Sequence, residues 1–477
     1  MNVGRVTWCL AAVLLLALVS PGTGCDDSPS DGDGDGDGDG DGDADGDGDG
    51  DGDGDGDCGA IVTFEDGLTP SAEIHVATDG QDSTGDGSAG NPYGTIDHAL
   101  SLATPGTAIM VHAGTYSGGV YASDVRGTET APIWIGGAPG EAIPVISGGG
   151  AGIHLVHVSY LIVHDLEVTG ASDNGINCDD GGDYADDTAT HHVIFRDLSI
   201  HDIGGGGNQD CLKLSGVNDF FVLDSEMAFC GGGMSGSGID HVGCHHGLIA
   251  RNDFHDSSGN AIQCKGGSED LEIRWNRMTD AGERAVNMGG STGFEFFRPP
   301  LSDGSPNAEA RDIRVISNVI EGSTSSLAFV GCVGCAAVNN TIVDPDHWIF
   351  RILQETTSSE GYEFLPCSDN LVSNNLISFE RGAISTYVNI GPDTASETFT
   401  FSNNLWYARD VPGDSEPTLP VAETGAVIGE DPAFTSGYEI DSTSPAAGAG
   451  TTYSGLVGDI TGACYDSPPS IGAYEVP

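Results

Sequence analysis

The chain has 477 residues, with 73 acidic residues against 15 basic ones, 74 glycines and a formal net charge of −58. Of the acidic residues, 16 are aspartates between positions 26 and 57, so the sequence after this stretch holds 57 acidic and 14 basic residues, a net charge of −43. This charge excludes binding to nucleic acids or to anionic membrane surfaces, because both need a basic footprint. So much glycine also disfavours a helix-rich architecture.

The N-terminus predicts export. Arg5 precedes an apolar stretch, 10–19, and small residues follow it up to Gly24, the pattern of a signal peptide over 1–24. The apolar stretch is too short to span a bilayer, which takes about 20 residues. Cys25 resembles the lipidation site of bacterial lipoproteins, so we expect the protein at the outer membrane or cell surface, held only by a lipid anchor. Cleavage and secretion without lipidation is the alternative.

An acidic tether follows the signal peptide. Residues 25–58 hold the lipidation site and an Asp-Gly alternation that is broken only by Ala44. Glycine makes such a segment flexible, and the repulsion between aspartates extends it. The alternating aspartates also resemble calcium loops, but the distal glutamate of such loops is missing. The sequence therefore favours a solvated tether over a calcium-binding segment.

The next segment, 59–150, is expected to cap the fold and begin it. Residues 93–103 have helical spacing, and Thr95 is a plausible N-cap. A short amphipathic helix here would cover a core and strand edges that the first turn of the fold would otherwise expose.

The body, 151–410, consists of short β-branched segments separated by Gly, Asn and Asp, with no helical period between them. This pattern predicts an all-β solenoid in which each rung buries its apolar side chains only by stacking on its neighbours. The last segment, 411–477, is rich in glycine and less periodic, and is expected to close the fold.

One column of strands can be aligned by its glycine-flanked cores, which begin at Ile153, Ile176, Leu212, Ile239, Ile262 and Val286. Side chains alternate along a strand, so the central residue of each core points outward. Rungs lie about 4.8 Å apart, so these residues should form one polar ladder. The ladder consists of His154, Asn177, Lys213, Asp240, Gln263 and Asn287.

The cysteines fit an exported protein, in which disulfides are permitted. In this alignment Cys178 and Cys264 face inward three rungs apart, about 14 Å, which is too far for a bridge. They are interpreted as small core residues. Cys332, Cys335 and Cys367 could pair locally or take part in a zinc site, although the sequence offers no clear fourth ligand.

Several segments carry a family resemblance. Residues 74–80, 85–93 and 105–116 are similar to the N-terminal segment of pectate-lyase-like right-handed parallel β-helix proteins, and 431–434 with 471–475 resemble the closing segment of many of them. The resemblance implies an all-β right-handed parallel β-helix with a short N-terminal capping helix. It does not decide the activity, because this fold hosts lyases, hydrolases, epimerases and non-catalytic surface proteins.

The only two lysines of the chain, Lys213 and Lys265, fall in the aligned column, and Arg284 lies close by. Cleaving a uronate polymer by β-elimination requires a base for a weakly acidic proton and a cation that neutralises the adjacent carboxylate. Lysine can be that base when its surroundings lower its pKa. Lys213 is the first candidate, with Lys265 or Arg284 as substitutes. Simple pairing with neighbouring aspartates is the alternative.

Asp179, Asp180 and Asp183 precede Lys213 in an order that resembles family-nine pectate lyases, where an Asp-Asp-Gly-x-Asp calcium motif precedes a catalytic lysine. The resemblance implies that these three residues bind Ca²⁺ and that Lys213 is the base. The family also draws a calcium aspartate from the preceding rung, where this chain has His154. An ordinary acidic loop beside a ladder lysine is the alternative.

Four further residues are candidates for substrate binding: Asp210, Asp240, His245 and Arg298. Arg298 could reach over the ladder from a long insertion. Asp210 and Asp240 are also the candidates for a hydrolase, which would need two carboxylates flanking the bond about 5–9.5 Å apart. His245, in a pair with His246, could be an acid/base residue or simply a solvated turn histidine.

Together these observations predict a surface-anchored, monomeric polysaccharide lyase that cleaves an acidic glycan by β-elimination. The first alternative is a non-catalytic carbohydrate-binding or adhesive protein, and the second is a glycoside hydrolase. The net charge of −43 favours the binding protein, because an acidic body repels a uronate polymer unless calcium intervenes. Calcium dependence therefore distinguishes the lyase from the binding protein.

Overall fold

The computed structural model describes residues 58–205, 207–233 and 235–476. The predictions for the signal peptide, for Cys25 and for nearly all of the tether concern residues outside this range. Among the described residues, no helix has the length and apolar character needed to cross a membrane.

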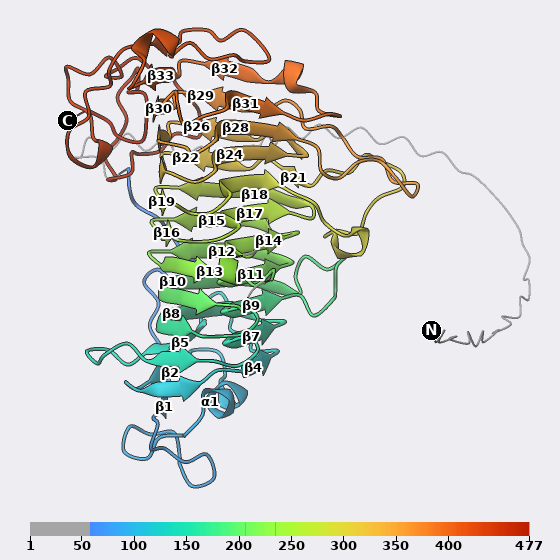
Figure 1. Ribbon diagram of the computed structural model, residues 1–477. Helices are drawn as coiled ribbons and strands as arrows, with labels where there is room; N and C mark the ends of the chain where they lie inside the picture. The colour runs from blue at the N-terminus through green and yellow to red at the C-terminus, as the bar shows by residue number, and fades with distance from the viewer. Residues whose placement is uncertain (1–57, 206, 234, 477) are drawn as a thin grey trace, which may run out of the picture. The chain divides into compact units, whose positions relative to one another are not determined.

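The chain is a right-handed parallel β-helix, as the sequence predicted, and every strand ladder in it is parallel. Figure 1 shows the strands of the described part stacked rung on rung. The aligned column forms one ten-stranded sheet in that part of the chain. Its strands are β4 (Val120–Ser123), β7 (Ile153–Val156), β9 (Ile176–Asp179), β11 (Leu212–Ser215), β14 (Ser237–Val242), β17 (Asn260–Lys265), β20 (Arg284–Gly289), β24 (Ser325–Val330), β28 (Trp348–Leu353) and β31 (Thr386–Ile390).

The remaining strands form the other walls of the coil. They are β1 (Ala72–Val76), β2 (Thr107–Val111), β3 (Thr115–Ser117), β5 (Ile133–Gly137), β6 (Val145–Ser147), β8 (Ser159–Thr169), β10 (Thr190–Ile203), β12 (Val217–Leu223), β13 (Glu226–Cys230), β15 (His245–Ala250), β16 (Asp253–His255), β18 (Ser268–Arg274), β19 (Arg277–Thr279), β21 (Ala310–Arg311), β22 (Arg314–Ile316), β23 (Val319–Glu321), β25 (Cys332–Val333), β26 (Ala336–Val338), β27 (Thr341–Val343), β29 (Leu371–Ser373), β30 (Leu376–Phe379), β32 (Thr400–Ser402), β33 (Leu405–Ala408) and β34 (Val427–Ile428).

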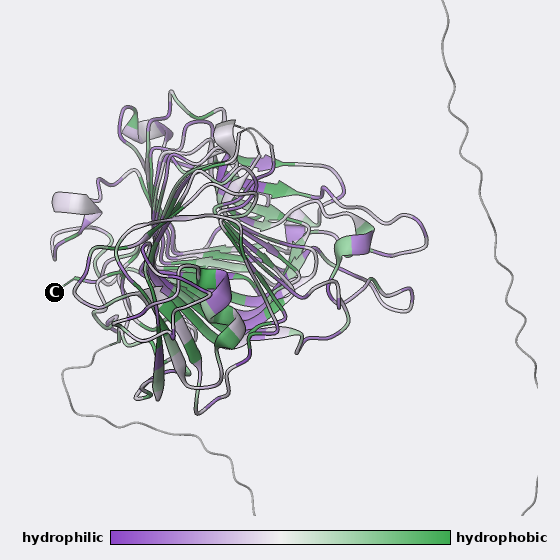
Figure 2. Ribbon diagram, turned by 90° about the horizontal axis from the view of Figure 1, so that it is seen from below, coloured by the Kyte–Doolittle hydropathy of each residue, from purple (hydrophilic) through white to green (hydrophobic). Residues whose placement is uncertain are grey.

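The helix α1 (Ile96–Leu102) confirms the predicted cap. Its N-cap is Thr95, whose hydroxyl accepts a hydrogen bond from the backbone N–H of His98 at 3.3 Å. Ile96 and Leu100 point into the same core as the first rungs. Figure 2, seen along the stack, shows α1 at the end of the coil. Its buried side chains cover a core that no further rung would cover there. Short 3-10 turns lie at Gly231–Gly233, Phe294–Phe296, Ser396–Thr398, Pro412–Asp414 and Ser436–Tyr438.

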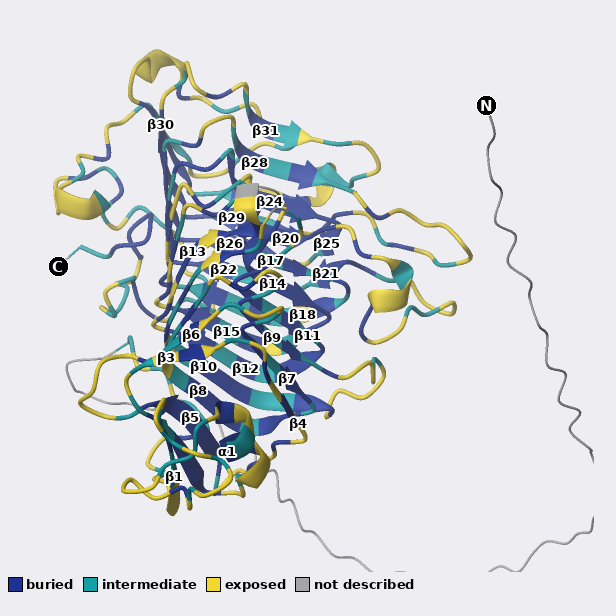
Figure 3. Ribbon diagram, turned by 60° about the horizontal axis from the view of Figure 1, so that its bottom comes forward, coloured by how far each residue is buried: buried dark blue, intermediate teal, exposed yellow. Residues whose placement is uncertain are grey.

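The register of the aligned column is confirmed. Ile176 pairs with Ile153 on one side and with Leu212 on the other, and the ladder continues through Ile239, Ile262 and Val286. These residues are fully buried in the core. The residues after them point away from the core, although Asp240 and Asn287 are covered by neighbouring groups and are also buried. Figure 3 shows the contrast between buried strands and exposed turns. The predicted polar ladder from His154 to Asn287 therefore exists.

A second ladder, of asparagines, runs through a corner of the coil inside the fold. Each carboxamide oxygen accepts the backbone N–H and the side-chain N–H of the previous rung, at 2.8–3.0 Å in the Asn318, Asn340 and Asn375 steps. The residue before each asparagine has a positive φ, for example +54° at Asn339, which Asn tolerates better than most residues. The second residue of each asparagine pair, at 339–340, 374–375 and 403–404, thus forms part of a hydrogen-bonded turn ladder.

The closing segment has two parts. Residues 419–426 pack against the last rungs of the core, and Glu423 accepts the backbone N–H of Asn404, which ends the asparagine ladder. The rest of the segment turns back along the outside of the coil, where Ile440, Ile471 and Tyr474 pack on side chains of β23, β30 and β33 (Figure 1).

Two disulfides are present among the described residues, Cys58–Cys464 and Cys211–Cys230. Cys178 and Cys264 are buried and unbridged, as predicted, and so are Cys332, Cys335 and Cys367. Cys58–Cys464 joins positions 406 residues apart and fastens the closing segment to the start of the described chain.

Replacing Cys58 and Cys464 together by alanine is expected to lower the free energy of unfolding by about 2–5 kcal/mol, since a bridge that closes a long loop restricts the unfolded chain most. Urea unfolding measures the loss. Cys178→Ala, which removes a buried thiol but no bridge, is the control. A double variant no less stable than this control would contradict the prediction.

Candidate functional site

The outer face of β9, β11, β14 and β17 carries the candidate site. A cavity of about 560 Å³ lies on this face. Five residues singled out from the sequence line it: Asp179, Asp180, Lys213, Lys265 and Arg298. The fold brings them together because β9, β11 and β17 lie in one ladder and the insertion between β20 and β21 returns to the same face.

Lys213 lies at the centre of a buried charge cluster. Its Nζ donates a short hydrogen bond to Oδ2 of Asp240 and lies 3.7 Å from Oδ2 of Asp210. Both aspartates are only 1 % exposed. Burial by itself would lower the pKa of Lys213, but the charges of Asp240 and Asp210 outweigh burial and raise it. Lys213 is therefore held as an ammonium ion at neutral pH.

Lys265 shares the same counter-ion. Its Nζ lies 3.2 Å from Oδ2 of Asp240, and it also donates to Oε1 of Gln263 at 3.4 Å. One buried carboxylate thus holds both lysines of the chain against the cavity. Burial raises the pKa of Asp240, but the two lysines outweigh it and the net shift is downward, so this group stays ionised.

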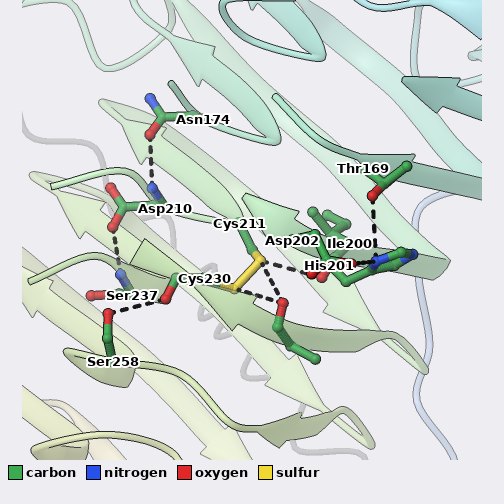
Figure 4. Close-up of a disulfide and its surroundings, with 11 residues drawn as sticks. Thr169, Asn174, Ile200, His201, Asp202, Asp210, Cys211, Cys230, Ser237 and Ser258 are labelled. Carbon is green, nitrogen blue, oxygen red and sulfur yellow. Dashed lines mark hydrogen bonds and ion pairs between the residues drawn. A yellow bond between two sulfur atoms is a disulfide. The ribbon is translucent and has the colours of Figure 1, made fainter. Parts of the chain in front are cut away.

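Asp210 differs from Asp240 although they lie side by side. Its Oδ1 accepts the backbone N–H of Ser237 at 2.8 Å, while its own N–H donates to Oδ1 of Asn174 at 2.9 Å (Figure 4). The Cys211–Cys230 disulfide follows directly and fixes this part of the rung to β13. Burial, and then repulsion by Asp240, raise the pKa of Asp210 to about 7. This group consequently changes charge near neutral pH.

Arg298 crosses the cavity from the insertion and binds Asp180. Its Nε and Nη2 donate to the two carboxylate oxygens of Asp180 at 2.6 and 3.0 Å. The guanidinium carbon lies 4.1 Å from the ring centre of Tyr184, a cation–π contact. Arg298 is 7 % exposed. The sequence offered this placement over the ladder only as a possibility; in the structure Arg298 lines the cavity, and its ion pair with Asp180 was not predicted.

Asp179, Asp180 and Asp183 do not converge on one point. Asp179 accepts hydrogen bonds from His154 at 2.7 Å and Asn177 at 2.6 Å, and although burial raises its pKa, these bonds lower it overall. The partner of Asp183 is His157, at 3.3 Å. No group of three His, Cys, Asp or Glu residues suited to a metal is found over 58–205, 207–233 and 235–476. As arranged, the three aspartates do not fit a calcium ion, and calcium binding stays a prediction.

A second cavity of about 540 Å³ continues the first along the ladder. Asn208, Lys265 and Ser291 line both, so the two form one groove over successive rungs. Arg284 lies in the second cavity, where it donates to Oε1 of Glu355 at 2.6 Å and to Oδ1 of Asn287 at 3.1 Å. Arg284 therefore belongs to the groove but not to the Lys213 cluster.

Three of the predicted site residues, Asp210, Asp240 and His245, do not line the first cavity. Asp210 and Asp240 lie beneath Lys213 and do not line the cavity. His245 begins β15 on another wall of the coil and lines a third cavity of about 200 Å³, which shares Asp180, Tyr184 and Arg298 with the first. Its Nε2 contacts the carbonyl of Gly267 at 3.1 Å, and burial lowers its pKa.

Sequence reasoning missed several residues of the cavity wall. Tyr184, Asn208, Ser215, Thr292 and Phe296 line it. Ser215 is two positions after Lys213 on the same strand, so period-two alternation could have identified it. The others lie in loops between rungs, where no periodicity predicts which residue faces the groove.

The raised pKa of Asp210 makes stability depend on pH. The folded protein holds this proton up to about pH 7, whereas an unfolded aspartate loses it near 3.8. Stability from this group is thus fully present below about pH 4 and is lost as pH rises through about 7. Asp210→Asn does not titrate, so the stability of the wild-type protein relative to this variant should fall between about pH 4 and 8. Urea unfolding at each pH measures it, and a pH-independent difference would contradict the shift.

The fold is a right-handed parallel β-helix with a groove on the outer face of one parallel sheet. Residues 78–137 match a family described as a protein of unknown function (DUF1565). Among curated proteins, none matches the chain significantly.

Solved structures give the nearest points of comparison. The chain is similar to the pectate lyase Pel9A, with 15% identity, a TM-score of 0.57, and coverage of 88% of this chain and 100% of that one. An alginate lyase from Paenibacillus sp. str. FPU-7 matches with 16% identity, a TM-score of 0.44, and 68% and 96% coverage. A rhamnogalacturonan lyase matches with 13% identity, a TM-score of 0.43, and 73% and 90% coverage. The likeness to Pel9A, at 15% identity, establishes the fold alone.

Proposed function

We propose that this protein is an exported polysaccharide lyase that cleaves an acidic glycan by β-elimination. One observation carries the proposal: both lysines of a chain with 73 acidic residues line a single groove together with Arg298. Lysine and arginine donors gathered in one groove of so acidic a protein suit an anionic ligand, and an extended groove over several rungs suits a polymer. The fold likeness to a pectate lyase supports the same class.

In this proposal the sugar carboxylate lies between Lys265 and Arg298, whose charges stabilise the negative charge that develops during proton removal. The neutral amine of Lys213 takes the proton from C5. The C5–H electrons form the C4–C5 double bond, and the C4–O bond breaks with its electrons on the leaving oxygen, which takes a proton from solvent. Lys213 then returns its proton to solvent. No step depends on a metal ion.

The charge state of Lys213 sets the expected pH dependence. Its pKa is raised, so the neutral amine is a minor form at neutral pH. The rate of elimination is expected to increase about tenfold per pH unit below that pKa, as long as proton removal limits the rate. The lyase would therefore work best under alkaline conditions.

A non-catalytic glycan-binding protein is the second candidate, and the same cluster favours it. An ammonium ion held by Asp240 and Asp210 is a good partner for a carboxylate but a poor base. A glycoside hydrolase has less support, because Asp210 and Asp240 are buried under Lys213 and do not face the groove.

Incubation with a panel of uronate polysaccharides, followed by the ultraviolet absorbance of unsaturated uronate ends, tests the proposal. The assay is run with calcium and with a chelator, from neutral to alkaline pH. New absorbance that increases with pH supports the lyase. Binding to the same polysaccharides without any unsaturated product would instead assign the protein to the glycan-binding class.

Surface anchoring through Cys25 is part of the proposal and has its own test. Expressed with its own N-terminus in a bacterium, the protein is expected to partition into detergent, and Cys25→Ser is expected to release it into the aqueous phase. Aqueous partitioning of the unchanged protein would contradict the anchor but leave the proposed chemistry intact.

A further inference from the structure

The insertion that joins β20 to β21, residues 290–309, is tied down at its end. Glu309 is fully buried and accepts hydrogen bonds from the backbone N–H of Gly266 and of Thr292, each at 2.9 Å, and from the Thr292 hydroxyl at 2.8 Å. The hydroxyl of Thr356 also binds it. The insertion is thereby fixed to the strands beneath it, and Arg298 is presented to the groove from a defined position.

Glycines on three successive rungs make room for Arg298. A Cβ added at Gly243 would lie 2.3 Å from the Cβ of Arg298, and one at Gly267 would lie 2.5 Å from its carbonyl oxygen. At Gly216 an added Cβ would lie 2.4 Å from Oδ2 of Asp180 and 2.9 Å from Nε of Arg298. Any larger residue at these turns would clash with Arg298 or with the carboxylate that it binds.

The guanidinium of Arg298 binds the carboxylate of Asp180, which a metal ion at this corner would need as a ligand. Both oxygens of Asp180 accept from Arg298, and Asp180 is 1 % exposed. Three of the five guanidinium N–H groups are used, by these two bonds and by the Phe296 carbonyl at 2.8 Å. The structure describes no partner for the other two N–H groups, and the arginine lines the groove. A carboxylate ligand would find a fixed, permanently charged donor at this position.

We propose that Arg298 is the built-in cation of this groove: it takes the place of calcium at the Asp179–Asp180 corner and binds the carboxylate of an acidic sugar, so that the site works without a metal ion. The binding of a sugar carboxylate and the metal-independent activity rest on the proposed function. The replacement of calcium concerns Arg298 and Asp180 alone.

Calcium titration of the full chain by calorimetry tests whether Arg298 takes the place of calcium. The unchanged protein and Asp180→Asn are expected to give the same isotherm, because the exposed acidic residues contribute equally to both. Arg298→Gln leaves Asp180 as a buried carboxylate without a cation, and a calcium ion that neutralises this charge is expected to raise the thermal midpoint of the variant when calcium replaces chelator. The double variant Arg298→Gln/Asp180→Asn, which leaves no unpaired buried charge, is expected to lose that gain.

A calcium site in the unchanged protein that disappears in Asp180→Asn would overturn the inference. So would an Arg298→Gln variant that folds and gains no calcium dependence. Arg311→Gln is the matched control, since Arg311 lies just beyond the same insertion and donates only to the exposed Pro306 carbonyl at 3.2 Å among the bonds described for its side chain. It should behave as the unchanged protein.

Measuring activity tests the role of Arg298 in binding the sugar carboxylate without a metal ion. Formation of unsaturated uronate should be the same with calcium and with chelator, and should fall about 10²-fold or more in Arg298→Gln. Loss of product on chelation in the unchanged protein would overturn metal independence. If no polysaccharide gives product, the proposed function fails, while the calcium titration still decides the place of Arg298.

Discussion

Replacing Lys213 with arginine is expected to lower kcat/KM on an acidic polysaccharide by about 10²–10⁴-fold, the usual contribution of a positioned general base. Arginine keeps the positive charge between Asp210 and Asp240, so the fold and the affinity for an anionic glycan should persist. It cannot lose its proton at accessible pH, so it cannot act as the base. Product formation measured beside binding of the same polysaccharide separates the two roles.

Lys265→Arg is the matched control, since Lys265 contacts the same carboxylate of Asp240 at 3.2 Å. The control is expected to keep most of the activity at every pH. If Lys265→Arg were the inactive variant and Lys213→Arg the active one, the base would be Lys265. Equal activity of both variants would exclude lysine as the base.

Replacing Asp240 with asparagine is expected to have two large effects. It removes the carboxylate that compensates both lysines, and losing one partner of a buried ion pair costs about 3–5 kcal/mol of unfolding free energy. It also lowers the pKa of Lys213, because the charge of Asp240 is the main cause of its upward shift. The alkaline limb of the pH–rate profile should move to lower pH. Urea unfolding and the pH profile measure the two effects.

Asp253→Asn is the control for this change, because Asp253 is an exposed aspartate at the start of β16. Its stability and pH profile should match those of the unchanged protein. If Asp240→Asn were as stable as this control, the lysine cluster would not depend on Asp240. An unchanged pH profile would show that Lys213 does not carry out the rate-limiting proton transfer.

The fold could be predicted because the residues that define it lie close together in the sequence and repeat along it. Each rung repeats β-branched residues between glycine and asparagine turns, and the cores that begin at Ile153, Ile176 and Leu212 align without any knowledge of the loops between them. The outward position of Lys213 followed from the same alternation. Because the only two lysines of the chain fall in this column, the sequence also indicated the face of the coil on which the cavity lies.

The contacts of the site were less predictable, because they join residues that no period relates. Arg298 and Asp180 are separated by 118 positions, and their bond depends on the path of an insertion. The sequence also could not show that Asp210 and Asp240 lie beneath Lys213 instead of facing the groove, because burial is set by neighbouring loops. For the same reason the aspartate motif predicted calcium ligands, although one of those carboxylates is bound to Arg298.

The Cys58–Cys464 bridge has a consequence for proteolysis. It makes the chain between these positions a covalent ring. One cut by a protease in any exposed loop of that ring would open it without releasing a fragment, and the rungs on both sides of the cut would stay joined. The exposed insertions that build the groove can thus be nicked while the two ends of the coil remain one molecule.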